Sequence, residues 1–388
     1  MPTLTPIRLT FAGGLHVGTR GVNLEEADVS IPSDTLFAAL LDGWRRLGQN
    51  PERFAAPFVA DPSDPPFLLT SAFPLAGDVR FFPVPVDAAR LFNAGTIGTR
   101  GKSIKRIRYL SEGLLRRVIA GERLDTWLFP EDEYADPTTG VALQGGTLWL
   151  SREEIDALPQ EFRTVKNAAG AVMPRPVHAL RRLSLWKSAR VPRVTIDRSS
   201  SASNIFHAGK TTFNQNCGLW FGVVWRQPAT VVPGTNITYE NAVDQILAVL
   251  QSDGLGGERS TGYGAFVADE ADETFSFDDA QAGEPLLLLS RYHPRGSELP
   301  DALTAARSAY RLTAVAGWLR SPDGAAQRRK RLMLVSEGSI VCPPVHPAGD
   351  VSDVRPTYHS AAVAFPHPVY RYGMAVGIGF GKAGEDND

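Results

Sequence analysis

Five glycines lie within the eleven residues 254–264, which read GLGGERSTGYG. Glycine has no Cβ atom, so such a loop can turn tightly and bring bare backbone N–H groups close to a ligand. Arg259 and Ser260 add a charged donor and a hydroxyl. Donors of this kind suit phosphate oxygens. The candidate ligand-binding residues of the loop are Gly254, Gly256, Gly257, Arg259, Ser260 and Gly262.

The loop does not match two well-known phosphate-binding motifs. No Gly-Lys-Ser/Thr closes it, as a P-loop would require. It also leaves a predicted helix and enters a predicted strand, which reverses the order of a dinucleotide-binding motif. A plain helix-to-strand turn therefore remains an alternative to phosphate binding.

Basic residues are clustered, although the formal net charge of the chain is only -2. This balance excludes a nucleic-acid binder that is basic throughout, but it allows a local basic track. The first cluster contains Arg100, Lys102, Lys105, Arg106 and Arg108, the second extends from Arg175 to Arg198, and the third is Arg328–Arg331. For the first cluster, the alternative to nucleic-acid binding is a solvated helix face. For Arg193 and Arg198 of the second cluster, the alternative is pairing with Asp197.

Length and composition predict a globular chain of two domains. The chain has 388 residues, of which 43% are hydrophobic and 21% are charged. Its two cysteines favour reduced cytoplasmic thiols over a disulfide framework. We expect no membrane span, no signal peptide and a cytoplasmic location, because no long apolar run is present. The scattered histidines predict no metal site and no cofactor.

Hydrophobic periodicity predicts the elements that position these residues. The pattern predicts strands at 7–11, 67–70, 79–86 and 219–225, a hairpin at 140–150, and helices after Ser33 and over 239–252. Ser33 is the expected N-cap of its helix. Residues 100–120 are expected to be partly helical, and the polar stretch 197–216 is expected to lie outside the core.

The order of these elements is β-α-β-β, a long interruption, then β-α-loop-β. It is typical of a ferredoxin-like or RRM-like domain with insertions. A second unit begins near Pro285, with strands expected at 286–290, 332–335, 339–342 and 372–380. The predicted fold class is therefore α+β.

Several separate segments resemble one family. Residues 31–40, IPSDTLFAAL, resemble the first-helix signature of the RAMP subunits of CRISPR effectors, and 254–264 resembles their glycine-rich loop. Ile196-Asp197-Arg198, with the polar stretch that ends at Phe213, is similar to the thumb hairpin of those subunits. Residues 102–121, 337–340 (EGSI) and 367–373 (HPVYRYG) are closest to the fourth subunit of type III-A (Csm) complexes, which caps the crRNA 5′ handle.

The resemblance implies two RRM-like domains. The first is expected at 1–270, with insertions at about 88–176 and a thumb at about 197–216, and the second at 283–388. It further implies a non-enzymatic subunit that binds the crRNA 5′ tag in an antiviral interference complex. The implied protein partners are the large polymerase-like subunit and a backbone RAMP subunit, with target RNA contacted indirectly and no membrane partner.

The resemblance also suggests roles for individual residues. Ile205, Phe206 and His207 of the thumb are candidates for insertion between bases, or for packing on a neighbouring subunit. Arg371, in the cluster with His367 and Tyr370, either contacts RNA or caps a sheet. His16 is a candidate RNA contact. In related guide-processing nucleases a histidine near this position acts as a general base, so a metal-independent RNA endonuclease is the alternative function. That chemistry needs a second positioned group, and the sequence shows no partner for His16.

Overall fold

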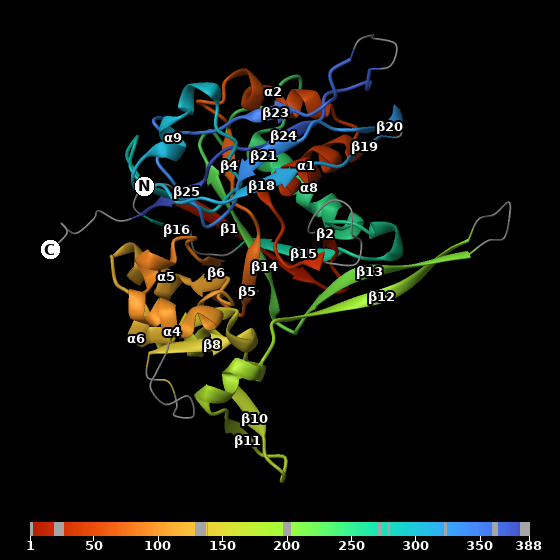
Figure 1. Ribbon diagram of the computed structural model, residues 1–388. Helices are drawn as coiled ribbons and strands as arrows, with labels where there is room; N and C mark the ends of the chain where they lie inside the picture. Colours follow the sequence, from red (N-terminus) through yellow and green to blue (C-terminus); the bar gives the residue numbers. More distant parts are fainter. Residues whose placement is uncertain are drawn as a thin grey trace.

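The chain folds as a mixed α+β structure built on one large sheet (Figure 1), which confirms the predicted fold class at this level. The computed structural model describes residues 3–18, 27–128, 137, 139–196, 203–270, 274–277, 280–321, 324–358 and 364–380. The main sheet runs in the order β15-β1-β14-β5-β6-β7-β9-β8, and β16 and β4 pair with β1 and β14. Its strands are β1 (Thr3–Phe11), β4 (Phe67–Leu69), β5 (Phe73–Ala76), β6 (Val79–Pro83), β7 (Tyr109–Ser111), β8 (Gly140–Leu143), β9 (Leu148–Ser151), β14 (Cys217–Trp225), β15 (Phe266–Glu270) and β16 (Phe275–Ser276).

Strand β1 lies between β14 and β15, and both pairings are antiparallel. Helix α1 (Ser33–Arg46) follows β1, and helix α8 (Tyr239–Asp253) follows β14. The two helices pack on each other, because their apolar side chains recur at helical spacing and are buried, including Phe37, Trp44 and Ile246. Helix α2 (Pro51–Ala60) packs beside α1. The predicted strands and helices of this part are confirmed.

The N-cap prediction for Ser33 is wrong. Pro32 occupies the N-cap position of α1 and makes no side-chain capping bond. The Ser33 hydroxyl instead accepts a hydrogen bond from the backbone N–H of Arg291, while the Ser33 N–H donates to the Ser71 hydroxyl. Long-range contacts have therefore replaced the local cap.

Segment 88–176 adds three strands to the main sheet. The predicted hairpin is confirmed as the antiparallel pair β8–β9, and β9 joins β7 in parallel. Strands β10 (Thr164–Lys166) and β11 (Val172–Pro174) form a small separate hairpin. The helices of this region are α3 (Ala88–Leu91), α4 (Ala94–Ile104), α5 (Glu112–Ile119), α6 (Asp125–Leu128) and α7 (Gln160–Arg163), with short 3-10 turns η1 (Gln144–Gly146), η2 (Arg152–Ala157) and η3 (Val177–Arg182).

A long antiparallel hairpin extends away from the body of the molecule (Figure 1). Its strands are β12 (Trp186–Ile196) and β13 (Ser203–Phe213), so the hairpin begins earlier than the predicted thumb at 197–216. The expectation that this stretch lies outside the core is also wrong at its base, where Ala208 and Thr211 are buried.

The C-terminal part consists mainly of short strands. They are β17 (Leu286–Leu288), β18 (Leu312–Val315), β19 (Trp318–Ser321), β20 (Gly324–Arg328), β21 (Leu332–Val335), β22 (Ile340–Val341), β23 (Val351–Asp353), β24 (Tyr370–Tyr372) and β25 (Gly377–Gly379). Its helices are η5 (Gly296–Glu298) and α9 (Asp301–Thr304). Among the residues described at 280–321, 324–358 and 364–380, no helix is longer than four residues, so a second RRM-like domain, which needs two helices on its sheet, is not confirmed.

The C-terminal part shares the main hydrophobic core with α1. Tyr372 is fully buried, its ring stacks on Phe37 with centroids 5.0 Å apart, and its hydroxyl accepts a 2.8 Å hydrogen bond from the Leu69 N–H. Burying an aromatic side chain of this size contributes about 1.5–3 kcal/mol relative to leaving it exposed. The two parts are thus packed as one body at this point.

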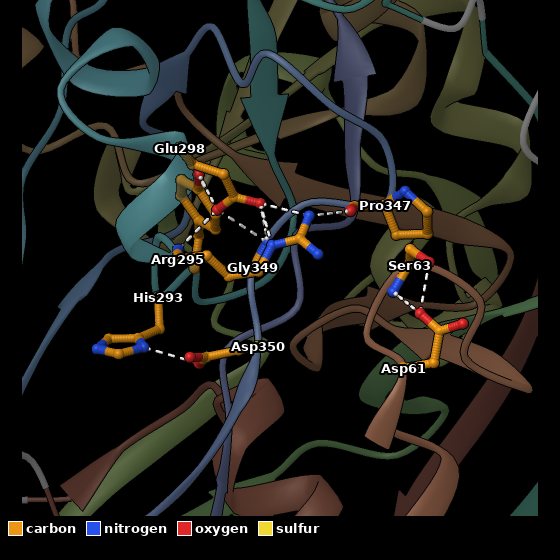
Figure 2. A network of polar contacts seen from close by, with 9 residues as sticks. Asp61, Ser63, His293, Arg295, Glu298, Pro347, Gly349 and Asp350 are labelled. Atoms are coloured by element: carbon orange, nitrogen blue, oxygen red, sulfur yellow. Dashed lines mark hydrogen bonds and ion pairs between the residues drawn. The ribbon is translucent and has the colours of Figure 1, made fainter. Parts of the chain in front are cut away.

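A polar network fixes the loops of the C-terminal part (Figure 2). Glu298 is fully buried and accepts hydrogen bonds from the Arg295 guanidinium at 2.7 Å, the Tyr292 hydroxyl at 2.9 Å and the Gly349 N–H at 2.9 Å. Nearby, His293 Nδ1 lies 2.7 Å from the Asp350 carboxylate, and this hydrogen bond raises the pKa of His293.

Candidate nucleic-acid interface

Three segments that are distant in sequence meet at the base of the long hairpin. The connection after β1 pairs with β13, because Leu15 and Thr211 exchange two backbone hydrogen bonds of 2.8 Å. The same connection holds the glycine-rich loop, since the Gly264 N–H donates to the Gly14 carbonyl at 2.7 Å and the Gly257 N–H donates to the His16 carbonyl at 2.8 Å. We call this meeting point, formed by 12–16, 254–264 and the base of β12–β13, the hairpin junction.

Close backbone packing explains two of the glycines in the loop. Gly256 has φ +86°, and a Cβ atom there would lie 2.3 Å from the His16 carbonyl oxygen. Gly264 has φ +82°, and its Cβ would lie 2.0 Å from the Leu255 carbonyl oxygen. At Gly262, with φ +83°, a Cβ would meet nothing within 4 Å. The loop therefore combines a tightly packed turn with an exposed edge, which carries Gly257, Arg259, Ser260, Thr261 and Gly262.

His16 is a buried part of the junction. It is 4% exposed, and its Nδ1 donates a 2.8 Å hydrogen bond to the Gly209 carbonyl oxygen of β13. Its ring also lies against Gly257, where a Cβ would come within 2.9 Å of His16 Cδ2. These contacts join the glycine-rich loop to the long hairpin, and they keep the His16 ring buried.

Two cations lie around the ring of Tyr263 at the junction. The Arg193 guanidinium is 5.2 Å and the Lys210 ammonium 5.6 Å from the ring centroid. Arg193 also donates to the Thr261 hydroxyl at 3.3 Å. Such cation–π contacts hold charged heads in place without neutralising them. The sequence analysis predicted Arg193 but missed Lys210 and Tyr263. The only sequence signal for Tyr263 was the position of its aromatic ring between two glycines of the loop.

Arg259 is held by an acidic residue of α1. Its guanidinium lies 3.3 Å from the Asp42 carboxylate, which also binds Arg45 and Arg46 at 3.0 Å. Burial raises the pKa of Asp42, but the hydrogen bonds from Arg46, Arg45 and Arg259 outweigh it and hold that pKa below its usual value. One carboxylate thus lies among three arginines, and a second, Asp253, binds Arg46.

The hairpin carries positive charge and an exposed apolar pair. Its described strands contain Lys187, Arg190, Arg193 and Lys210 and no acidic residue. Val194 and Ile205 are direct partners across the ladder and are 56% and 66% exposed.

The remaining predicted hairpin residues are Phe206, His207 and Arg198. Phe206 is half-buried opposite Arg193, and His207 is exposed opposite Pro192. Arg198 lies outside the described residues. Ile205, Phe206 and His207 are consecutive on β13, so their side chains alternate between the two faces of the hairpin.

The first basic cluster borders the base of the hairpin. Arg108 forms a 3.1 Å ion pair with Asp28 of β3 (Ala27–Asp28), which pairs with β2 (Val17–Gly18) and packs against β13. Arg106 donates to the Gly145 carbonyl at 3.2 Å. Lys102 and Lys105 are exposed, and Arg100 marks a kink in α4. The cluster covers the end of α4 and the loop that precedes β7 rather than one continuous helix face.

Arg371 lies away from the junction, in a buried ionic cluster at the start of α1. Its side chain is 16% exposed and lies 3.5 Å from the Asp34 carboxylate, which also pairs with Arg291 at 3.0 Å. Burial lowers the pKa of Arg371, and the charge of Arg291 lowers it further. In this structure Arg371 ties β24 to α1.

Among the described residues, no three His, Cys, Asp or Glu side chains are grouped so that they could hold a metal ion. In the same part of the chain, no helix has the length and apolar character needed to cross a membrane.

Comparisons with known proteins agree with the resemblance noted in the sequence. Residues 281–380 match the family model of the CRISPR Csm4 C-terminal domain. The chain is 24% identical over 297 residues to "CRISPR system Cms protein Csm4" of Thermococcus onnurineus (strain NA1), covering 73% of this chain and 89% of the relative.

Solved structures show the same fold. The crystal structure of a Csm3-Csm4 subcomplex in the type III-A CRISPR-Cas interference complex contains a chain with a TM-score of 0.59 and 15% identity, covering 97% of this chain and 99% of that one. A Csm1-Csm4 cassette in complex with cA4 contains a chain with a TM-score of 0.51 and 16% identity, covering 98% of each.

Proposed function

We propose that this chain is a member of the Csm4 family of type III-A CRISPR-complex subunits, as its C-terminal family match and its curated relative support, and that it binds the 5′ tag of the guide RNA at the hairpin junction. The observation that carries the proposal is the pair of cations, Arg193 and Lys210, held over Tyr263 beside an exposed glycine-rich edge. Basic groups fixed in this way can contact phosphates whatever the base sequence.

The surroundings of the junction support a nucleic-acid ligand. The hairpin strands carry four basic residues and no acidic one, and Arg108 lies next to β3 at the hairpin base. Exposed Ile205 has the apolar character needed to separate neighbouring bases. The Thr261 and Gly262 N–H groups donate to the Glu258 and Arg259 carbonyls within the loop, so its exposed edge offers the side chains of Arg259 and Ser260 rather than these N–H groups. Phosphate contacts would come from the cations, and base contacts from the hairpin.

We also infer a ferredoxin-like core for residues 1–270. The strand order β15-β1-β14-β5, with α1 after β1 and α8 after β14, supports it. This arrangement supports the assignment to the RAMP superfamily, because it places the glycine-rich loop between the second helix and the last strand.

The proposed partners are a backbone RAMP subunit and the large polymerase-like subunit. Their support is the likeness in fold to chains solved in Csm3-Csm4 and Csm1-Csm4 complexes. In this arrangement the chain would bridge the two subunits and contact target RNA only indirectly.

We propose that the chain binds RNA without cleaving it. The Nδ1 of His16 carries the proton that it donates to the Gly209 carbonyl, and the ring is buried. A general base must reach the proton that it removes, and these contacts hold His16 in a structural position instead.

Binding of the purified chain to guide RNA with and without the 5′ tag, in EDTA, tests this function. We expect tag-dependent binding and intact RNA, and about 1–3 kcal/mol weaker binding after Arg193→Ala with Lys210→Ala. Arg163→Ala with Lys166→Ala removes the same charge from the region of α7 and β10 and is the matched control. Equal affinity for tagged and untagged RNA would contradict tag recognition, and site-specific cutting that is lost on His16→Ala would establish the endonuclease.

A further inference from the structure

A second basic surface lies in the C-terminal part, on different elements from the hairpin junction. Residues 302–336 contain seven basic residues and a single acidic one, Asp323, in a chain whose net charge is -2. The basic residues are Arg307, Arg311, Arg320, Arg328, Arg329, Lys330 and Arg331. Strand β18 runs antiparallel to β21, and β19 runs antiparallel to β20, so residues 310–321 and 324–335 form a two-stranded structure that we call the basic ribbon.

Trp318 is the most unusual residue of the basic ribbon, because its side chain is 56% exposed. Arg328 is its direct partner on β20, and the Arg328 guanidinium lies 5.7 Å from the centre of the Trp318 ring. The next residue, Leu319, is only 3% exposed and packs with Val354 and Phe365. The inner face of the ribbon is therefore anchored in a small core, which holds the Trp318 ring toward solvent.

Other rings and apolar side chains on the ribbon are also exposed. Tyr310, Leu312 and Met333 are 42%, 48% and 43% exposed. Lys330 and Arg331 connect β20 to β21 and are exposed as well. The surface thus alternates open apolar side chains with cations and has little opposing charge.

We propose that the outer side of the basic ribbon binds single-stranded RNA. Arg328, Lys330 and Arg331 contact phosphates, and a base stacks on the exposed face of Trp318. Every base has a π face and every nucleotide a phosphate, so this combination binds single strands with little sequence preference. A purely apolar docking face would not gather the six basic residues of the ribbon, and a duplex would offer no unpaired base to an exposed ring.

The experiment uses the full-length chain and an oligouridylate of about 12 nucleotides that lacks the tag, a length within the site sizes of such proteins. Trp318→Ala is expected to weaken binding at least about fivefold, the lower limit for loss of one base–aromatic stack. Trp318→Phe keeps a ring and is expected to retain most of the affinity. Arg328→Ala with Lys330→Ala and Arg331→Ala is expected to lower the slope of log affinity against log salt by about 2.

Two results would overturn the proposal. One is unchanged oligouridylate affinity in both Trp318→Ala and the triple variant. The other is unchanged RNA affinity together with lost binding of the large subunit, which would make the ribbon a protein-docking surface. Repeating the measurement in a chain with Arg193→Ala and Lys210→Ala removes phosphate contacts at the hairpin junction, so failure here and failure of tag recognition there are distinguishable.

The RNA strand that occupies the ribbon can be identified in the assembled complex. Thiouridine-labelled guide RNA and thiouridine-labelled target RNA are photocrosslinked in separate reactions, with the wild-type chain and with Trp318→Ala. A crosslink to residues 310–335 that is lost in the variant supports the proposal and identifies which of the two RNA strands occupies the ribbon. Absence of such a crosslink from both strands would contradict it.

Discussion

The guanidinium of Arg193 lies 5.2 Å from the centre of the Tyr263 ring, so a strand of the long hairpin and the glycine-rich loop are joined through one cation–π contact. Lys210 approaches the same ring from the other hairpin strand, at 5.6 Å. The ring therefore fixes the direction of both charges, and phosphate binding at the hairpin junction should depend on Tyr263.

Replacing Tyr263 tests this dependence. Tyr263→Ala is expected to weaken binding of tagged RNA by about 0.5–2 kcal/mol, because the two cations lose the surface that orients them. Tyr263→Phe keeps the ring and should bind as the wild type does. Fluorescence anisotropy with labelled guide RNA measures both affinities, and equal losses in the two variants would instead assign the effect to the hydroxyl.

Removing the charge of Asp42 should strengthen RNA binding. Asp42 pairs with Arg259, Arg45 and Arg46, so Asp42→Asn releases Arg259 for contact with phosphate. We expect tighter binding by up to about 1 kcal/mol, with a stability loss of the same order, because these ion pairs are partly exposed. A titration at several salt concentrations checks this. Weaker binding in a folded variant would show that Arg259 must be held by Asp42 to act.

Two glycine substitutions separate backbone strain from close packing in the loop. Gly256→Ala and Gly262→Ala both place an alanine at positive φ, which costs about 1–2 kcal/mol. Only Gly256→Ala also drives a Cβ to within 2.3 Å of the His16 carbonyl oxygen. Urea unfolding should therefore show a clearly larger loss for Gly256→Ala. Equal losses would mean that the His16 segment moves aside without cost.

The His293–Asp350 pair should make stability depend on pH. Its hydrogen bond raises the folded-state pKa of His293 above the ordinary value of about 6.5. The protonated pair therefore stabilises the fold fully below pH of about 6.5, and this contribution is lost as the pH rises through the raised pKa. The difference in unfolding free energy between wild type and His293→Gln should shrink over that range. A difference that does not change with pH would exclude the ion pair as its source.

Truncating the Glu298 side chain to alanine should be among the most destabilising substitutions in the chain. Its side chain is fully buried, and its carboxylate accepts hydrogen bonds from the Arg295 guanidinium, the Tyr292 hydroxyl and the Gly349 N–H (Figure 2). Glu298→Ala leaves a largely buried guanidinium without its carboxylate and is expected to cost about 3–5 kcal/mol. Thermal unfolding measures the loss. Asp353→Ala breaks the more exposed pair with Arg355 and serves as the control, with an expected cost of at most about 1 kcal/mol.

The sequence predicted the elements whose own periodicity decides their burial. Helices α1 and α8 follow from apolar residues at helical spacing, and the β8–β9 hairpin follows from two glycines between apolar runs. The long hairpin was predicted too short, because β12 mixes basic and apolar residues without clear alternation. Its strand character depends on pairing with β13, which no local pattern reveals.

Contacts between distant segments limited prediction of the site. Lys210 and Tyr263 belong to different segments, and each looks ordinary in its own surroundings. Arg371 resembles an RNA-binding residue in the sequence, yet it pairs with Asp34 of α1. Ser33 has the residue type of a cap, but its hydroxyl is used by Arg291. Each of these contacts depends on a partner that only the fold brings near.

The stacking of Tyr372 on Phe37 has a consequence for how the chain unfolds. Because one core contains side chains from α1 and from β24, the C-terminal part cannot melt without uncovering the first helix. Heating should therefore give a single cooperative transition rather than two. A force applied to the C-terminal part by a bound partner would reach α1 directly, and from there Asp42 and the glycine-rich loop.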